Sequence, residues 1–435
     1  MNVPLDIAER TRRRVTWRIM PYLLLLYIIA FLDRVNVGYA NLTMSADLGF
    51  SAAVFGTGAG IFFIGYFLLE IPGTLLVENW SARGWIARIM ISWGILAVMM
   101  GFIHTKTQFY WIRFLLGAAE AGFFPGIIVY LSHWFRYQDR AKALAFFASG
   151  ITISNIIGSP VSGFLLQFNW LGMAGWRWLF ILEGLPAILF GVITIFYLTD
   201  WPRQAKWLPD DEREWLTGEL ERERKLRGAE HSHRIWEALR QRDVVQLAVA
   251  YFFIVTCSYG FSFWLPAIVK KSSGLSDFKV TLVSALPYCV GLAGMLLNGW
   301  SSDKTGERRW HTAGAILLVS VGFYLSTLTE NVALSIGMLC LAALGLFGYL
   351  PSFWSLPSSF MTGSAAAASI GLINSVGNLG GFLGPYIVGK INTMTDSFIG
   401  GVLYLAASAL ISAMLVISLR KGRVKISTVA EARAD

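Results

Sequence analysis

The sequence predicts an all-α polytopic membrane protein with twelve transmembrane helices in two six-helix bundles that repeat one another. Three observations predict this fold class. Hydrophobic residues make up 55% of the 435 residues and charged residues only 14%, whereas about a quarter of a soluble globular domain is charged. Twelve apolar runs are each long enough to cross a bilayer. One long polar segment, residues 200–243, divides the runs into six and six.

The apolar runs predict helices, because a segment in lipid must satisfy its own backbone hydrogen bonds and only helices and closed barrels do so. Runs of this length are typical of helices rather than of the shorter barrel strands. In chain order they are residues 18–40, 53–78, 85–103, 108–134, 141–167, 176–199, 244–269, 280–300, 311–329, 332–358, 364–390 and 397–419.

The polar segment and the runs on either side of it predict three parts. We expect an N-terminal bundle at 1–199, a cytosolic linker at 200–243 and a C-terminal bundle at 244–435. Within the linker, Pro209 followed by three acidic residues predicts the start of a helix. His231 and His233 lack the further ligands that a metal site needs, so we expect no metal.

The two halves resemble an old duplication. Small residues recur at an offset near 226: Gly73 with Gly299, Gly122 with Gly348, and Pro125 with Pro351. Parallel repeats of this kind are typical of transporters. The charged residues inside the runs do not recur, since Asp33, Arg113 and Glu120 fall opposite apolar or aromatic positions. Ionic chemistry is therefore expected in the N-terminal half.

The distribution of Lys and Arg predicts the orientation. If the N-terminus is inside, most of the basic loop residues fall on the inner side, as the positive-inside rule requires. We therefore expect a multi-pass protein of the cell inner (plasma) membrane with both termini cytoplasmic. The net charge of +9 is then a signal of topology rather than a nucleic-acid patch. No small-residue cleavage site precedes the first run, so we expect no cleaved signal peptide.

The stretch WIRFLLGAAEAGFFPG, residues 111–126, carries two full charges inside an apolar run. Arg113 and Glu120 are seven residues apart, which places both side chains on one helix face. A charge at this depth costs several kcal/mol when it faces lipid, so this face must look into protein or a water-filled cavity. The pattern favours a site for a solute or ion; the alternative is a structural ion pair between helices.

The first run adds the adjacent charges Asp33 and Arg34. By helical rise, Arg34 and Arg113 can lie at similar depth on different helices. Two planar cations at one level suit a carboxylate, which Arg grips with two hydrogen bonds. Asp33 and Glu120 are the matching acids, and we expect them to carry protons. In the alternative interpretation the two acids only neutralise the arginines.

Further polar residues lie inside the runs. Tyr66 and Asn155 stand in otherwise apolar walls, and Asn374 and Asn378 share one helix face. We expect them to contact substrate. Trp354 could line the same cavity, although a Trp near the end of a run is more often an interfacial anchor. Glu70 and Glu183 are expected to form structural pairs or gates.

No enzyme is expected. The sequence contains no GxSxG, HExxH or GxxxxGK[ST] pattern. Without a nucleotide site, any pumping must use an ion gradient, so no cofactor is expected beyond a proton gradient as the driving force.

Several motifs resemble a known family. GWSSDKTGERR at 299–309 resembles the signature loop G-x-x-x-D-R-x-G-x-R of the major facilitator superfamily. The loop after the second run departs from this signature, because Val77 stands where Asp is usual, with Glu78 beside it. That departure resembles the anion:cation symporter family within the superfamily. So do FLDRVNVGYA at 31–40, RFLLGAAEAGFFPG at 113–126, GWRWLFILEGLPA at 175–187 and INSVGNLGGFLGPYIVG at 373–389.

The resemblance implies two six-helix bundles around a midplane cavity, with alternating access. It implies proton sites at Asp33 and Glu120, and substrate contacts at Arg34, Tyr66, Arg113, Trp354 and Asn374. It also implies a gating role for the loop residues on the inner side, which here are Gly73, Glu78, Arg83, Gly299, Asp303, Lys304, Gly306 and Arg308.

The expected function is a symporter that brings a small organic anion, such as a hydroxy-, sugar- or aromatic carboxylate, into the cell with protons. Its partners are then the carboxylate, protons and the lipid bilayer; nucleic acid is not expected, and we expect a monomer. A close alternative is an organic-anion exchanger or a drug/proton antiporter, since Gly158-Ser159-Pro160 weakly resembles an antiporter motif. A membrane sensor that transports nothing is the remaining alternative. Substrate-dependent proton uptake in liposomes would separate these three.

Overall fold

A computed structural model describes residues 3–79, 81–227, 240–360 and 363–419. Of the residues named above, His231 and His233 lie outside the described ones. In the N-terminal half the helices are α1 (Val3–Leu48), α2 (Ala52–Asn79), α3 (Ala82–Met100), α4 (Lys106–Glu120), α5 (Phe123–Trp134), α6 (Tyr137–Ala148), α7 (Gly150–Leu165) and α8 (Gly175–Tyr197).

The polar segment between the halves contains α9 (Asp210–Arg227). In the C-terminal half the helices are α11 (Arg242–Ser273), α12 (Asp277–Thr305), α13 (Arg309–Ser326), α14 (Val332–Phe360), α15 (Gly363–Thr395) and α16 (Ile399–Ile417). Short 3₁₀ turns lie at Trp170–Gly172 and Pro202–Gln204.

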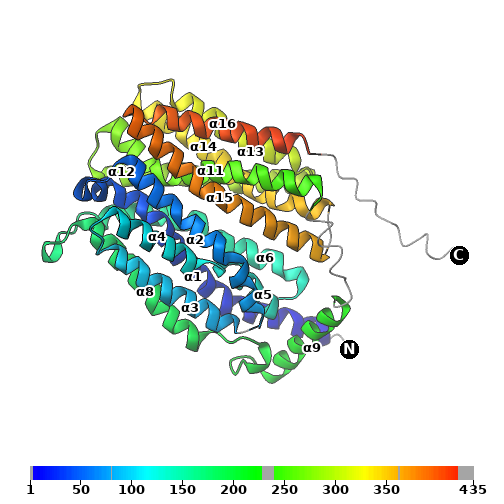
Figure 1. Ribbon diagram of the computed structural model, residues 1–435. Coiled ribbons are helices and arrows are strands. Elements are labelled where there is room, and N and C mark those ends of the chain that lie inside the picture. Colours follow the sequence, from blue (N-terminus) through cyan, green and yellow to red (C-terminus); the bar gives the residue numbers. More distant parts are fainter. Residues whose placement is uncertain (1–2, 80, 228–239, 361–362, 420–435) are drawn as a thin grey trace.

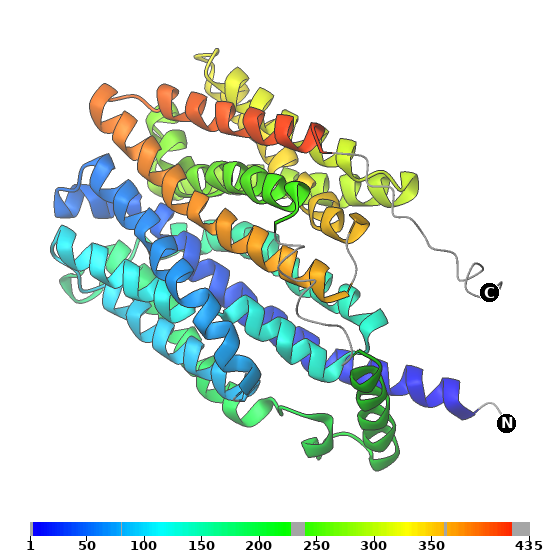
Figure 2. The ribbon, with the colours of Figure 1, turned by 45° about the vertical axis from the view of Figure 1, so that its right-hand side comes forward.

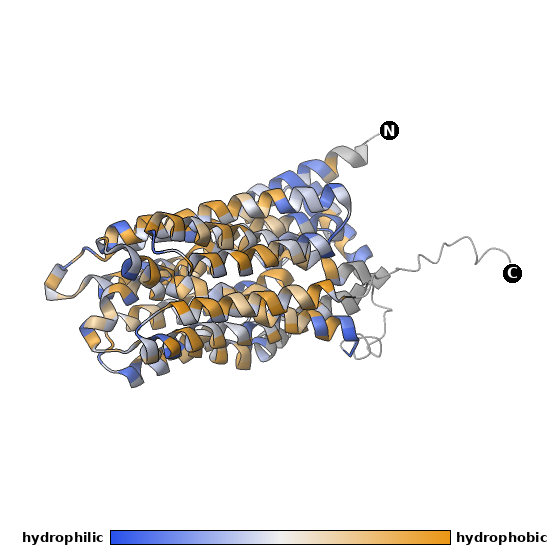
Figure 3. Cartoon of the chain, turned by 90° about the horizontal axis from the view of Figure 1, so that it is seen from above, coloured by the Kyte–Doolittle hydropathy of each residue, from blue (hydrophilic) through white to orange (hydrophobic). Residues whose placement is uncertain are grey.

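The helices run roughly parallel and form two groups (Figures 1 and 2). α1 begins and α16 ends at the same end of the molecule (Figure 1). We call this end the terminal face and the opposite end, where α1 ends at Leu48, the far face. Hydrophobic residues cover most of the length of the helices and hydrophilic residues gather toward the two ends (Figure 3), which is the pattern of helices that cross a bilayer.

Ten segments of the described chain are helices long and apolar enough to cross a membrane. They include the pairs α4–α5 and α6–α7, each of which forms one crossing. Apart from α9 of the polar segment, the described α-helices outside this set are α13 and α15. α13 packs against α14 and α16, and α15 packs against α11 and α2. The predicted fold class of an all-α membrane protein with twelve crossings is therefore confirmed.

Two crossings are interrupted, which the apolar runs did not show. The run at 108–134 is two helices, because Gly122 adopts a left-handed conformation with φ of 84°. Glycine reaches this region without steric cost. The break directly follows Glu120, the last residue of α4, so that the acid lies at a helix end inside the membrane. The run at 141–167 is likewise divided, at Ser149 between α6 and α7.

Glycines allow the close approach of helices in both bundles. A Cβ atom on Gly117 of α4 would lie 1.9 Å from the backbone oxygen of Phe62 in α2. Between the bundles, a Cβ atom on Gly56 of α2 would lie 2.3 Å from the backbone oxygen of Pro385 in α15. Small residues of this kind let membrane helices pack backbone to backbone. The α2–α4 contact holds Arg113 against α2, as described below.

The polar segment docks on the terminal face rather than lying free. α9 begins at Asp210, as the sequence predicted. Its Glu212 is fully buried and accepts ion pairs from Arg14 at 3.0 Å and Arg10 at 2.7 Å, both in the first turns of α1. Glu223 pairs with Arg140 of α6 at 3.6 Å. The described part of the segment is therefore tied to the N-terminal bundle. The exact division of the chain at 200 and 243 stays a prediction.

We expect Gly117→Ala to lower the melting temperature of the purified protein, because the new methyl group meets backbone that cannot rotate away. Overpacking of this kind costs about 1–3 kcal/mol. Thermal melting in detergent, followed by size-exclusion chromatography, measures the shift. Gly337→Ala on α14 is the matched control, since a Cβ atom there has nothing within 4 Å. Equal melting temperatures for the two variants would contradict the packing described here.

Candidate functional site

An ion pair between Arg34 of α1 and Glu120 of α4 lies in the interior of the N-terminal bundle. The Nη2 atom of Arg34 donates to Oε1 of Glu120. Only 13% of the Arg34 side chain and 2% of the Glu120 side chain are exposed. The sequence analysis placed Glu120 on one helix face with Arg113 and named it as an acid for the two arginines. The break at Gly122 leaves Glu120 at the end of its helix, where it pairs with Arg34 of α1.

Arg34 also contacts the other bundle. Its Nη1 atom donates to the hydroxyl of Tyr259 in α11 at 3.2 Å. The guanidinium group lies 5.5 Å from the ring centres of both Phe62 and Tyr66 in α2, close enough for cation–π attraction. The sequence analysis did not predict this contact. At the repeat offset of 226, Tyr259 is the C-terminal counterpart of Asp33, the neighbour of Arg34. One cation thus joins both bundles and a row of aromatic rings.

Asp33 makes different contacts from its neighbour Arg34. Its carboxylate accepts from Nε1 of Trp93 in α3 and from Nδ2 of Asn36 at 3.0 Å. Successive residues of a helix point about 100° apart, because the helix has about 3.6 residues per turn. Arg34 therefore turns to the interface between the bundles while Asp33 turns into the N-terminal bundle. The alternative interpretation, in which the two acids only neutralise the arginines, fits the ion pair of Glu120 but not the geometry at Asp33, which accepts hydrogen bonds from neutral donors.

Arg113 is fully buried against α2. Its Nε and Nη2 atoms donate to the backbone oxygens of Gly58 and Ala59, each at 3.2 Å. The guanidinium group lies 5.0 Å from the ring centre of Phe62, the same ring that Arg34 contacts. Two cations therefore flank one aromatic ring. The fork of the Arg113 side chain bridges two successive carbonyl groups, which an ammonium group cannot reproduce.

A second polar cluster crosses from α2 to α15. Glu70 accepts from Nδ2 of Asn374 at 2.8 Å, from Oγ of Ser375 at 3.1 Å and from Nδ2 of Asn378 at 3.4 Å. Glu70 is buried. The two asparagines expected to bind substrate are thus held by an acid of the opposite bundle. The sequence placed Asn374 and Asn378 on one face and proposed Glu70 as a pair or gate, but it could not show that they meet.

The other expected substrate residues are dispersed. Asn155 of α7 donates to the backbone oxygen of Ile151 in its own helix at 2.7 Å. Tyr66 is buried beside Phe62. Trp354 of α14 packs edge-on against Tyr251 of α11, with ring centres 4.9 Å apart. This contact places Trp354 in the interior of the C-terminal bundle rather than at an interface with lipid headgroups. Of these three, only Tyr66 contacts the Arg34 cluster directly.

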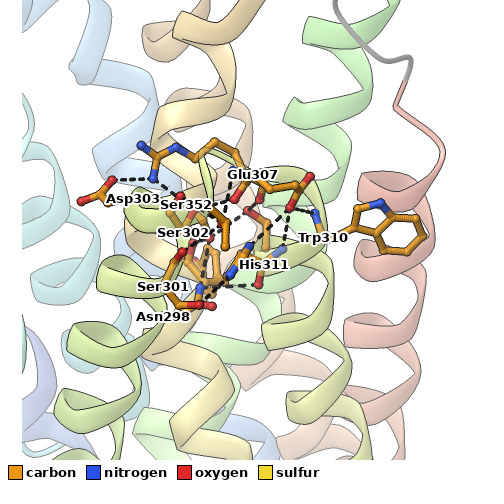
Figure 4. A network of polar contacts seen from close by, with 12 residues as sticks. Asn298, Ser301, Ser302, Asp303, Glu307, Trp310, His311 and Ser352 are labelled. Carbon is orange, nitrogen blue, oxygen red and sulfur yellow. Dashed lines mark hydrogen bonds and ion pairs between the residues drawn. The ribbon is translucent and has the colours of Figure 1, made fainter.

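The expected gating residues lie on the terminal face. Helix α12 continues to Thr305, further than its apolar run, and ends at Gly306 with φ of 68°. Asp303 pairs with Arg308 at 2.6 Å, and Arg308 donates to Ser302 at 3.0 Å (Figure 4). The same network reaches α13 and α14 through Asn298, His311 and Ser352 (Figure 4). Lys304 lies 5.0 Å from the ring of Trp300.

Among the expected gating residues of the N-terminal bundle, Arg83 pairs with Asp200. The backbone nitrogen of Arg83 donates to this acid at 2.9 Å, and the Arg83 side chain lies 3.8 Å from it. The surroundings of Gly73 and the side chain of Glu78 lie outside what the structure describes. Gly299 approaches Pro351, whose side chain would meet an added Cβ atom at 3.4 Å. These contacts hold the helix ends of each bundle together on one face.

The Arg34 guanidinium group can pair either with Glu120 or with the carboxylate of another molecule. A carboxylate that reaches Arg34 competes with Glu120 for the same guanidinium donors. Within the described residues, no group of three or more His, Cys, Asp or Glu side chains could hold a metal ion. The groups that the described site offers are the ion pair of Arg34 with Glu120, the hydroxyl of Tyr259 and the carboxylate of Asp33.

Comparison with known proteins assigns the chain to a family. The family model for the Major Facilitator Superfamily matches residues 23–385. The chain is 47% identical to the "Putative tartrate transporter" of Agrobacterium vitis, over 96% of each protein. It is 37% identical to the "Quinolone resistance transporter" of Acinetobacter baumannii, over 94% of this chain and 95% of that protein.

A solved structure shares the fold. A bacterial homologue of the human lysosomal transporter Spinster, in an inward-facing and unoccupied conformation, superposes with a TM-score of 0.73 at 19% identity, over 94% of this chain and 95% of that one. The likeness in fold agrees with the match of the family model. That family model and the two relatives named above describe transporters rather than enzymes. The chain is a multi-pass membrane protein that belongs to the major facilitator superfamily.

Proposed function

We propose that this protein imports a small organic anion together with protons, and that its substrate is a hydroxycarboxylate of the tartrate class. The observation that carries the proposal is the buried Arg34–Glu120 ion pair, which Tyr259 of the opposite bundle also contacts. A cation held this way has one acid partner that a substrate carboxylate can replace. The relative of 47% identity, whose printed description is a tartrate transporter, supports the substrate class.

The proposed coupling follows from competition at Arg34. When Glu120 is ionised it occupies the guanidinium group. When Glu120 takes up a proton it loses its charge and releases Arg34 to the substrate. Proton and anion then bind with positive coupling, and linkage requires each to favour the other equally. Coupling free energies of this kind are about 1–3 kcal/mol. Asp33, buried among neutral donors, is proposed as the second proton site.

Alternating access is proposed to occur between the two bundles. Hydrogen bonds now join them at the far face, where the backbone nitrogen of Ala53 donates to Thr393 at 2.8 Å, at mid-depth through Arg34 and Tyr259, and at Glu70. By helical rise, Glu70 lies roughly 6 Å nearer the terminal face than Arg34. Opening toward either face would break the contacts on that side. We place the protein in the cell inner membrane, as a monomer with both termini cytoplasmic.

A drug/proton antiporter is the second candidate, because a relative of 37% identity has the printed description of a quinolone resistance transporter. The two candidates differ in the direction of proton movement relative to the substrate. The buried arginines favour an anion, since an organic cation near Arg34 and Arg113 would be repelled. Uptake of tartrate that acidifies the liposome interior supports import with protons, whereas tartrate-independent export of a quinolone supports the antiporter.

We expect Arg113→Lys to lower tartrate uptake by at least about tenfold although the charge is kept. The lysine cannot bridge the carbonyl groups of Gly58 and Ala59 or grip a carboxylate with two bonds, and a loss of about 1.4 kcal/mol is tenfold. Initial uptake rates and tartrate affinity in liposomes measure the effect. Arg222→Lys on the exposed side of α9 is the control. Near-normal affinity in Arg113→Lys would exclude a carboxylate clamp there.

Glu120→Gln should bind tartrate with weaker pH dependence, because the amide resembles the protonated acid at every pH. It should exchange tartrate across the membrane but fail to concentrate it on a pH gradient. Counterflow and uphill uptake, measured on the same liposomes, separate the two abilities. Glu214→Gln, on the exposed surface of α9, controls for the loss of a carboxylate. If Glu120→Gln still accumulates tartrate, the ion pair is structural and the coupling proton binds elsewhere.

The hydrogen bonds from α15 to Glu70 should stabilise the protein, and the contributions of Glu70 and Asn374 to its stability should be coupled. We expect Glu70→Ala to lower the melting temperature, and Asn374→Ala to lower it less when Glu70 is already absent than in the wild-type protein. Hydrogen bonds inside membrane proteins give couplings of roughly 0.6 kcal/mol, with a maximum near 1.7. A double-mutant cycle of thermal melts in detergent measures this coupling. Strictly additive shifts would show that the contact does not hold the bundles together.

A further inference from the structure

Glu183 of α8 is a buried acid that the proposed function does not use. Only 7% of the residue is exposed. Its Oε1 atom accepts from Oγ of Ser162 in α7 at 3.1 Å, while its Oε2 atom has no hydrogen-bond partner. Among the described residues, no Lys, Arg or His lies within ion-pair distance of it. An ionised carboxylate in such a place would bear a charge inside the membrane without a cation beside it, which is costly.

Asn36 of α1 connects Glu183 to Asp33. Its Nδ2 atom donates to Asp33 at 3.0 Å, and its side chain lies near enough to Glu183 to interact with it electrostatically. The Oδ1 atom of Asn36 is buried without a partner. Two orphan acceptors, one on each residue, therefore lie in one small cluster. If both carboxyl groups were ionised, one amide would have to stabilise two negative charges.

A proton on Glu183 would remove its negative charge and would provide a donor for the unpaired oxygen of Asn36. A protonated carboxyl group carries an O–H donor, and the unpaired Oδ1 atom of Asn36 is an acceptor for it. The remaining neighbours are neutral: Ser162 of α7, and Trp93 of α3 on the far side of Asp33. Asp33 is the charged group that faces Glu183.

The depth of these groups orders them along the membrane. By a rise of about 1.5 Å per residue, Glu183 lies roughly 12 Å from the start of α8 at the far face, Asn36 roughly 18 Å from the end of α1 at the same face, and Asp33 roughly 22 Å. Glu183 therefore stands between the far face and the proton site expected at Asp33. α8 packs against α1, α3 and α7, so this route runs inside the N-terminal bundle, away from the substrate.

We propose that Glu183 is a proton-binding site that passes protons between the far face and Asp33 across Asn36. The inference rests on the proposed proton coupling and adds the residue through which Asp33 is loaded. In the transfer, the O–H bond of Glu183 breaks and an O–H bond forms on the Asp33 carboxylate. One water molecule held by the Oδ1 atom of Asn36 accepts the proton of Glu183 and donates another of its protons to the Asp33 carboxylate. The negative charge moves from Asp33 to Glu183, and no other reactant is consumed.

The first test asks whether Glu183 carries a proton, and it does not depend on transport. Infrared difference spectra between the wild-type protein and Glu183→Gln at neutral pH should show the carbonyl band of a protonated carboxyl group that the variant has lost. Glu307→Gln, which changes a partly exposed acid on the terminal face, should show loss of carboxylate bands instead. Loss of carboxylate bands in Glu183→Gln would overturn the proposal, because Glu183 would then be ionised.

The second test asks whether the proton moves. In liposomes, Glu183→Gln should keep tartrate counterflow within about twofold of wild type and lose at least tenfold of the accumulation on a pH gradient. Its amide still accepts from Ser162 and can donate to Asn36, so the fold should persist. Glu183→Asp and Glu183→Asn are a second pair of equal size: Asp should recover part of the accumulation and Asn should not.

The outcomes separate the two proposals. If the wild-type protein concentrates tartrate on a pH gradient and Glu183→Gln does so equally well, the relay through Glu183 is wrong while proton coupling stands. If Asp and Asn at position 183 behave alike, Glu183 acts through its shape and the relay is again wrong. If the wild-type protein does not respond to a pH gradient, the proposed function fails, and the relay to Asp33 fails with it even where the infrared spectra place a proton on Glu183.

Discussion

The positive charge of Arg34 has to be neutralised inside the membrane in every state of the protein. At this depth an unpaired guanidinium group is costly, so Arg34 keeps Glu120 beside it when no other anion is present. The break after Glu120 at Gly122, the aromatic rings of α2 and the hydroxyl of Tyr259 all surround this one pair. Because Tyr259 belongs to the opposite bundle, the state of the pair affects how the two bundles meet.

The other buried acids are stabilised differently, and this difference separates their tasks. Glu120 has a cation partner, and in the proposed mechanism a proton on Glu120 releases that cation. Glu70 accepts three bonds from α15 and so holds the bundles together. Within the described residues, the hydrogen-bond donors to Asp33 and Glu183 are neutral, and Asn36 lies near both acids, which suits the proposed exchange of a proton without the movement of a helix. Arg113 bridges two carbonyl groups of α2 and keeps its charge without an acid in contact.

Much of the fold could be predicted from the sequence because apolar length and charge determine which segments cross a membrane. Apolar length alone predicts the twelve crossings, and the charges of Arg113 and Glu120 inside an apolar run single out residues 111–126. The sequence could not show the break at Gly122, because a single glycine in an apolar run is compatible with a continuous helix. Nor could it show that Asp33 turns away from Arg34, or that Glu70 meets Asn374, since these contacts depend on how helices pack. The unpaired oxygens of Asn36 and Glu183 are visible only in three dimensions.

In the proposed mechanism a proton on Glu120 breaks its ion pair with Arg34, and the substrate carboxylate then takes the place of Glu120 beside Arg34. Calorimetry of tartrate binding to the detergent-purified protein, repeated in buffers of different ionisation enthalpy, counts the protons taken up on binding. We expect net proton uptake by the wild-type protein near neutral pH and a clearly smaller uptake by Glu120→Gln, because linkage ties anion affinity to protonation. Tartrate binding without net proton uptake at any pH, or equal uptake by the two proteins, would contradict it.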